Sequence, residues 1–361
     1  MTAAPWSEDT PDLLTRTLPH VAAAWVQMPD GELVELDLID GSVSWDERRS
    51  PRVEATLTCR RPTDEAALER IDPRLGVRLL VNAGYRRPDG TVDLQQLVDL
   101  GLRDRDIDMP EDTMRLFAQS DEALVIDNAP SAGGTINQAT TTASIVYVLQ
   151  LVIPGLSPTI TATAGAAVNQ SPIGDKWDAV NDLADRIDAK VYDNGLRVWF
   201  IAPTPTSISS PVHTVSDGVD GTIVRTRKGL SRTDFYNRVY LVYDWVDTGG
   251  TSHRVETVQS ISSGPYAATG TNIRTLAETR ELPATGTQAA AAGLAMVKRT
   301  VTRGRSLSLT AVSAYWLRPG HALTVTDVDG TVTHLVSSLE FDLKAGLMDI
   351  TTRLDDQLPQ P

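Results

Sequence analysis

Hydrophobic and polar residues alternate along much of the N-terminal third of the chain, which is the pattern of strands that bury one face. Between residues 34 and 38, aliphatic side chains take every second position and acidic side chains lie between them. Turn sequences rich in Asp, Gly and Pro separate such runs. We therefore predict an antiparallel β region with a short helical connector at 60–72 and strands at 22–28, 32–39, 41–45, 53–59, 76–84, 91–100 and 114–118.

The middle of the chain has a different pattern, in which helical and strand signals alternate. Residues 129–139 contain Pro and several Gly and indicate a linker. The apolar run at 140–153 fits either a packed helix or a buried strand, and we favour the helix. The Thr-, Ala- and Gly-rich stretch at 154–170 indicates a long surface excursion.

Residues 174–203 predict a compact unit of one helix and two strands. Asp175 is placed to cap the helix, because its carboxylate can accept hydrogen bonds from free backbone N–H groups. Asn194-Gly195 predicts a two-residue hairpin turn, and Pro203 ends the second strand. Three- and four-residue steps place the following side chains on one apolar stripe of the helix: Trp177, Val180, Leu183, Ala184 and Ile187.

The C-terminal part returns to strand patterns after a second linker at 204–211. Asp-Gly-Thr-Val occurs at 89–92 and again at 329–332, each time between an apolar run and a strand. A duplicated β-barrel would give such a repeat, but DG turns also recur for local reasons, so both explanations stay open. We expect an Ala-rich helix at 285–303 and strands at 237–245, 306–312, 321–327, 331–339 and 347–354.

Together these patterns predict a mainly β protein with an α+β insert. We expect two β-barrel domains that flank a mixed α/β domain. The first β-barrel domain would cover residues 1–130 and the α/β domain residues 131–210. The second β-barrel domain, with the helix near 285–303, would cover residues 211–361.

Composition and charge narrow the classes of function. Hydrophobic residues make up 41% of the 361-residue chain, which is enough for sizeable cores. The sequence has no run of 18 apolar residues, so no membrane span is predicted, and the N-terminus lacks the pattern of a signal peptide. Cys59 is the lone cysteine, so neither an intrachain disulfide nor a cysteine zinc cluster is expected. A net charge of −14 argues against binding of the nucleic-acid phosphate backbone as the main function, and we expect no sequence-specific nucleic-acid partner.

The sequence contains no recognisable catalytic or cofactor motif, and we assign no catalytic, cofactor-binding or metal-binding residue. His321 and His334 flank one predicted hairpin, but two histidines without a third ligand are more often surface residues. Acidic residues alternate from Asp104 to Asp108. Met109 and Arg115 stand where an EF-hand needs Gly and Glu, so a solvated acidic loop is favoured over a non-standard calcium site.

The tryptophans of the 174–203 unit raise a different question, since exposed aromatic rings can form a platform for sugars. Trp177 and Trp199 fall on inward faces of their predicted helix and strand. Trp316 stands just before a predicted strand. We favour packing in a core or interface over a sugar platform for all three.

The 174–203 unit resembles the middle domain of tail hub proteins from long-tailed bacteriophages. In that family a helix with an early Trp leads into a strand, a glycine turn and a second strand that ends in Pro. SAYWLRPGHALTV at 313–325 resembles the last barrel of the family, and NRVYLVY at 237–243 is also similar. Pro319-Gly320-His321 lacks the acidic residue that usually follows this glycine in the family. In order of elements, the resemblance covers roughly residues 20–355.

The resemblance implies a structural protein of the virion tail tip, without enzymatic activity and without a cofactor. It implies tail-tube-like barrels, and a homotrimer that joins the sixfold tail tube to a threefold tip around the channel for DNA and tape measure. The implied partners are the distal tail protein or tail tube, the tape measure protein, and tip or fibre proteins. Two alternatives stay open: a tail-associated cell-wall hydrolase and a β-rich receptor-binding adhesin.

Overall fold

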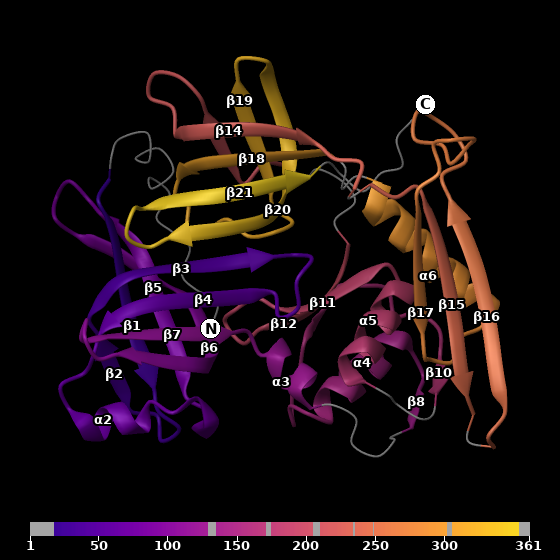
Figure 1. Ribbon diagram of the computed structural model, residues 1–361, viewed down its shortest axis with the longest axis horizontal. Helices are drawn as coiled ribbons and strands as arrows, with labels where there is room; N and C mark the ends of the chain where they lie inside the picture. The colour runs from indigo at the N-terminus through magenta and orange to yellow at the C-terminus, as the bar shows by residue number, and fades with distance from the viewer. Residues whose placement is uncertain are drawn as a thin grey trace.

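Both ends of the chain contribute strands to one 13-stranded sheet. The computed structural model describes residues 18–128, 135–170, 175–204, 210–233, 235–247, 249–301 and 305–353. The sheet runs in the order β14-β18-β21-β20-β3-β4-β7-β6-β5-β1-β2, while β19 pairs with β20 and β13 pairs with β19. It fills the left and upper parts of Figure 1.

The N-terminal strands are β1 (His20–Gln27), β2 (Leu33–Leu36), β3 (Leu38–Asp46), β4 (Val53–Arg60), β5 (Arg78–Arg86), β6 (Val92–Asp108) and β7 (Thr113–Gln119). The C-terminal strands are β13 (His213–Ser216), β14 (Ile223–Leu230), β18 (Arg305–Val312), β19 (Ala322–Asp327), β20 (Gly330–Asp342) and β21 (Leu347–Arg353). The helical connector after β4 consists of α2 (Glu65–Arg70) and a 3₁₀ turn, η1 (Pro73–Leu75). The predicted strands of both ends are confirmed in type, although several boundaries shift.

The two ends of the sheet repeat one arrangement. The N-terminal order β3-β4-β7-β6-β5 corresponds to the C-terminal order β14-β18-β21-β20-β19. The hairpins β6–β7 and β20–β21 have the same register, and each has a β-bulge at the same place, where Arg103 of β6 and Ser337 of β20 have no residue opposite. The outer pairs β3–β4 and β14–β18 share a second bulge, at Ile39 of β3 and Val224 of β14. Because bulges are placed individually, two matching bulges indicate structural repeats. The two Asp-Gly-Thr-Val turns join corresponding strands.

The repeats meet where β20 pairs with β3, from Ser338 opposite Asp46 to Asp342 opposite Ser42. The Trp45 and Phe341 rings pack edge to face across this junction, with centroids 5.8 Å apart. One continuous hydrophobic core therefore serves both repeats. A mainly β chain is confirmed. Two separately closed barrels are not found among the described strands, because β3 of one repeat pairs with β20 of the other.

A second core lies beside the sheet and contains four helices of the described chain. Its helices are α3 (Glu122–Asp127), α4 (Thr141–Gln150), α5 (Lys176–Arg186) and α6 (Gly286–Val301). Its strands are β8 (Ile136–Gln138), β9 (Thr159–Ile160), β10 (Val168–Gln170), β11 (Ala189–Asp193), β12 (Trp199–Pro203), β15 (Arg238–Val246), β16 (Ser252–Ser260) and β17 (Thr275–Arg280). In Figure 1 this second body lies on the right, with α6 beside the sheet β16-β15-β17.

The packing differs from the predicted division at residue 210. Segment 235–301 joins the second core with α4 and α5, whereas β18–β21 return to the first core. An apolar strand can bury its face against either core, so the order of strands along the sequence did not reveal this exchange. The helices predicted at 140–153 and 285–303 are confirmed as α4 and α6. Most of the predicted linker at 129–139 falls outside the described residues.

The 174–203 unit has the predicted order of elements but a different turn. Asp175 caps α5, and its carboxylate accepts a hydrogen bond from the Asp178 amide at 2.9 Å. The turn is a five-residue loop, 194–198, in which Gly195 and Arg197 adopt positive φ. The Asn194 side-chain oxygen accepts from the amides of Leu196 and Val198, at 2.8 and 3.3 Å, and this replaces the expected two-residue turn.

Candidate functional site

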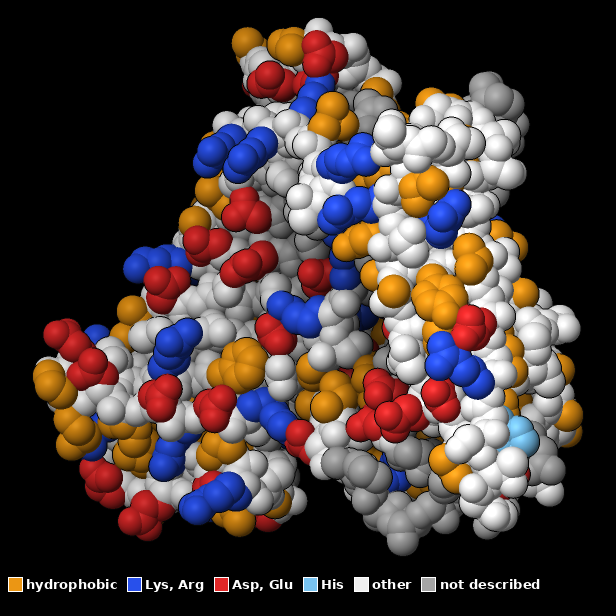
Figure 2. Space-filling view, turned by 45° about the vertical axis from the view of Figure 1, so that its right-hand side comes forward, with side chains coloured by type: hydrophobic (Ala, Val, Ile, Leu, Met, Phe, Trp, Pro, Cys, Tyr) orange, Lys and Arg blue, Asp and Glu red, His pale blue; other side chains and the backbone are white. Residues whose placement is uncertain are grey.

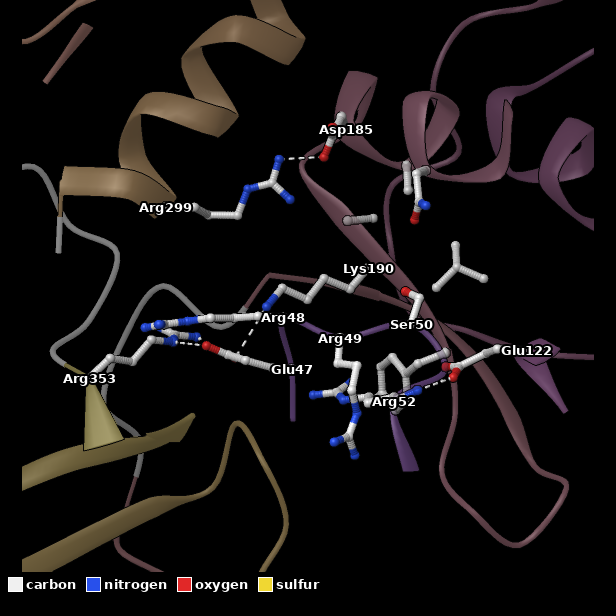
Figure 3. Close-up of a pocket in the computed structure, with 15 residues that line it drawn as sticks. Glu47, Arg48, Arg49, Ser50, Arg52, Glu122, Asp185, Lys190, Arg299 and Arg353 are labelled. Atoms are coloured by element: carbon white, nitrogen blue, oxygen red, sulfur yellow. Dashed lines mark hydrogen bonds and ion pairs between the residues drawn. The ribbon is translucent and has the colours of Figure 1, made fainter. Parts of the chain in front are cut away.

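A polar pocket of about 270 Å³ lies where the two repeats and the second core meet (Figure 3). The loop after β3, strand β11, helix α6 and the end of β21 all supply side chains to it. Basic residues outnumber acidic ones in its lining: Arg48, Arg49, Arg52, Lys190, Arg299 and Arg353 against Glu47, Glu122 and Asp185. In Figure 2 acidic and basic side chains follow the boundary between the two bodies, where the surface is hollowed.

Glu47 is the charged centre of this pocket. Arg353 donates two hydrogen bonds to its carboxylate, at 2.5 and 3.2 Å, and the Lys190 ammonium lies 3.1 Å from Oε2. Burial alone would raise the pKa of Glu47, but the charges of Lys190 and Arg353 outweigh it and hold the pKa at about 2. Burial lowers the pKa of Lys190 to about 8, against the opposing attraction of Glu47. The three side chains come from the loop after β3, from β11 and from β21, so this ion cluster connects three segments of the chain.

A second, acidic cluster continues from the pocket toward the hairpin β11–β12. Asp193 accepts from the amides of Asp121 and Gly195, both at 3.1 Å. Glu122 accepts from the amides of Asp193 and Arg52 and from the Ser120 hydroxyl. Burial, followed by the Asp121 charge, raises the pKa of Asp193 to about 7. Burial also raises the pKa of Glu122.

The tip of the β11–β12 hairpin inserts against the first core. The Asp99 amide donates to the Gly195 carbonyl at 2.7 Å, and the Trp45 indole N–H donates to the Asn194 carbonyl at 3.3 Å. A Cβ on Gly195 would lie 3.2 Å from a Val53 methyl, so only glycine fits this approach without a shift. The pocket and this hairpin therefore form a joint between the two cores of one chain.

The chemistry of the pocket is that of a structural joint. Its carboxylates are held by arginine, lysine or backbone amides, as the contacts of Glu47 and Glu122 show. A nucleophile needs a neighbouring base and a site that can stabilise developing charge. Within the described part of the chain, we find no such pair in this pocket. Sequence patterns did not indicate the joint, because its members are scattered over 300 positions.

The face of the sheet that points away from the first core is polar and open. Two hollows of about 370 and 540 Å³ lie along it and cross from one repeat to the other. The alternation that buries one face of each strand places hydroxyl and carboxylate side chains on the other. Side chains that line these hollows include Ser44, Thr56, Thr58, Ser308, Thr310, Glu340, Asp342, Asp349, Thr351, Arg225 and Arg227.

The residues weighed from the sequence take the following places. Asp104, Asp106 and Asp108 lie exposed on the far half of β6, so the expected acidic loop is wrong and the strand simply continues. His321 and His334 flank the β19–β20 hairpin as predicted. No group of three potential metal-ligating side chains occurs within the described ranges.

The tryptophans pack inside the molecule. The rings of Trp177 and Trp199 are buried and meet edge to face in the second core, with centroids 6.3 Å apart. Trp316 packs against the first core and meets the His213 ring at 5.3 Å. The predicted packing role is confirmed for all three.

Among the helices of the described segments, none combines the length and the apolar character that a membrane span requires.

The chain combines two repeated β units in one sheet with an α/β body that is joined beside them. No family model and no curated protein sequence matches the chain. Among solved structures it resembles a tail protein from Neisseria meningitidis, with a TM-score of 0.65 and 12% identity over 92% of this chain and 96% of that one.

Two prophage proteins are also similar. The 43 kDa tail protein of prophage MuSo2 from Shewanella oneidensis gives a TM-score of 0.64 and 13% identity, covering 93% of this chain and 99% of that one. The prophage tail protein gp18 from Listeria monocytogenes gives a TM-score of 0.56 and 11% identity, and the alignment covers 93% of this chain and 95% of that one. At these identities the likeness concerns the fold. The chain therefore has the fold of phage tail proteins.

Proposed function

We propose that this chain is a structural, non-enzymatic protein of a phage tail tip, and that three copies form a hub around a central channel. The observation that carries the proposal is the repeat within the sheet. Each chain supplies two equivalent β units side by side, so three chains supply six such tail-tube-like units. A ring of this kind can join a sixfold tube to a threefold tip.

The polar face of the sheet supports the proposal. A channel that passes DNA must avoid holding it, and carboxylates repel phosphate. This face carries Asp and Glu from both repeats, with hydroxyl side chains between them, and these carboxylates are interspersed with Arg49, Arg115, Arg225 and Arg227. The proposed partners are the distal tail protein or tail tube, the tape measure protein, and tip or fibre proteins.

The test is the mass and shape of the purified chain. Native mass spectrometry should give three times the mass of 39.1 kDa, and negative-stain images should show a ring with a central opening. A monomer at every concentration would overturn the proposed hub. Release of peptidoglycan fragments by the purified chain would overturn the non-enzymatic role.

A further inference from the structure

Among the strand edges of the large sheet that have no strand partner within the described chain are those of β14 and of the far half of β6. β14 pairs with β18 only and lies at the outer edge of the sheet, above β18 in Figure 1. β6 pairs with β5 up to Gly101, and beyond this residue it pairs with β7 alone. Open edges expose backbone donors and acceptors and are templates for pairing with another chain.

The internal repeat shows what these two edges correspond to. The register of β6–β7 matches that of β20–β21, so Asp108 corresponds to Asp342. In the same way β14 corresponds to β3, and Arg227 corresponds to Ser42. Within the chain β3 and β20 pair with each other. The two open edges are therefore the counterparts of two strands that already form a junction.

Transferring the internal register to the open edges gives a definite alignment. Ser42 lies opposite Asp342 within the chain, so Arg227 would lie opposite Asp108 of a second copy. By the same register Gly229 would lie opposite Asp106 and Leu230 opposite Arg105.

The charges of the two edges are complementary in this alignment. β14 carries exposed Arg225 and Arg227, whereas β6 carries exposed Asp104, Asp106 and Asp108. Arg227 faces Asp108 directly and reaches Asp106 on the diagonal, and opposite charges in both positions stabilise antiparallel pairs. Glycine at position 229 leaves room for the arginine to lean over this diagonal.

The apolar residues of β14 agree with a covered edge. Leu230 is 87% exposed, whereas Trp45, its counterpart in β3, is 2% exposed because the junction and the tip of the β11–β12 hairpin both cover it. In the transferred register Leu230 would pack on the stem of Arg105 and beside the half-buried Ile107.

We propose that β14 of one copy pairs antiparallel with the 104–108 half of β6 in a second copy, in the register that β3 and β20 use within the chain. The pairing rests on the proposed function and extends it to the strands that join the copies. Because the two surfaces differ, the contact is head-to-tail, and it closes only if the rotation per copy completes a circle.

The test is disulfide cross-linking of Arg227→Cys/Asp108→Cys under mild oxidation, read on a non-reducing gel and by native mass spectrometry. We expect a covalent ring of three chains from the double variant and a covalent dimer when the two single variants are mixed. Cys59 is fully buried and stays out of the reaction. The matched control is Arg227→Cys/Asp104→Cys, in which the second cysteine lies on the same face but about 13 Å further along the strand. This control should not cross-link.

A charge exchange gives a second readout without cysteine. Asp108→Arg should weaken association about fivefold per junction, and adding Arg227→Asp in the same chain should restore part of it, because the new carboxylate pairs with the arginine at position 108 of the second copy but still lies diagonal to Asp106. A trimer that forms without either cross-link or charge dependence would overturn the edge pairing and leave the hub standing. A chain that stays monomeric would overturn both.

Discussion

Replacing Glu47 with Gln should destabilise the protein strongly, because Glu47 is the common partner of two buried cations. The side chains of Glu47 and Arg353 are each 4% exposed, and that of Lys190 is 17% exposed. Glutamine keeps the shape but removes the charge. Arg353 and Lys190 would then stay buried with one neutral acceptor between them.

The structure sets the size of the effect in two ways. Removing one partner of a buried ion pair costs about 3–5 kcal/mol. The fall of the Glu47 pKa from 4.5 to about 2 corresponds to about 3 kcal/mol of stability. Because the pKa is lower in the folded state, this contribution is complete above pH 4.5 and is lost as the pH falls toward 2. The difference between wild type and Glu47→Gln should narrow over the same range.

The assay is urea unfolding followed by tryptophan fluorescence at a series of pH values. Asp37→Asn is the matched control, since Asp37 pairs with Arg60 at 3.0 Å but both side chains are more than 60% exposed. It should change the free energy of unfolding by less than about 1 kcal/mol. A loss below about 1 kcal/mol for Glu47→Gln at neutral pH would refute the joint, as would a loss that does not depend on pH between 2 and 4.5.

Three further predictions concern the two cores and their joint. Trp177→Ala should lower the stability of the second core by about 3–5 kcal/mol in urea unfolding, whereas Val219→Ala, at a 97% exposed position, should change it little. Gly195→Ala should shift the midpoint further than Gly250→Ala, because both have positive φ but only the first meets a methyl group, at 3.2 Å. An equal shift would mean that the hairpin tip does not press on the first core. The raised pKa of Asp193, about 7, means that this carboxyl destabilises the folded state as the pH rises from 3.8 to 7. Asp193→Asn should therefore gain stability relative to wild type over that pH range, and a constant difference would contradict the burial of a titrating group.

Local patterns predicted most elements because each depends on residues close together in the sequence. The Asp175 cap, the apolar stripe of α5 and the alternation along β4 all act within a few positions. The turn at 194–198 was missed although its residues are adjacent, because the Asn194 side chain takes over hydrogen bonds that a two-residue turn would leave to the backbone. Strand β17 was missed as well, since its alternation is short and its partner β15 lies in parallel beside it.

Patterns in the sequence were sufficient to predict a mainly β chain with an α+β insert, to show that it has no recognisable catalytic motif, and to find two turns consistent with a repeat. The packed chain was needed to show that the two β units repeat one arrangement, that they share one sheet through β3 and β20, and that segment 235–301 belongs to the second core. It also decided where Glu47, Lys190 and Arg353 meet. The physical reason is that strand pairing and ion-pair burial join residues hundreds of positions apart, and their free energy depends on the space and solvent around them rather than on their neighbours in the chain.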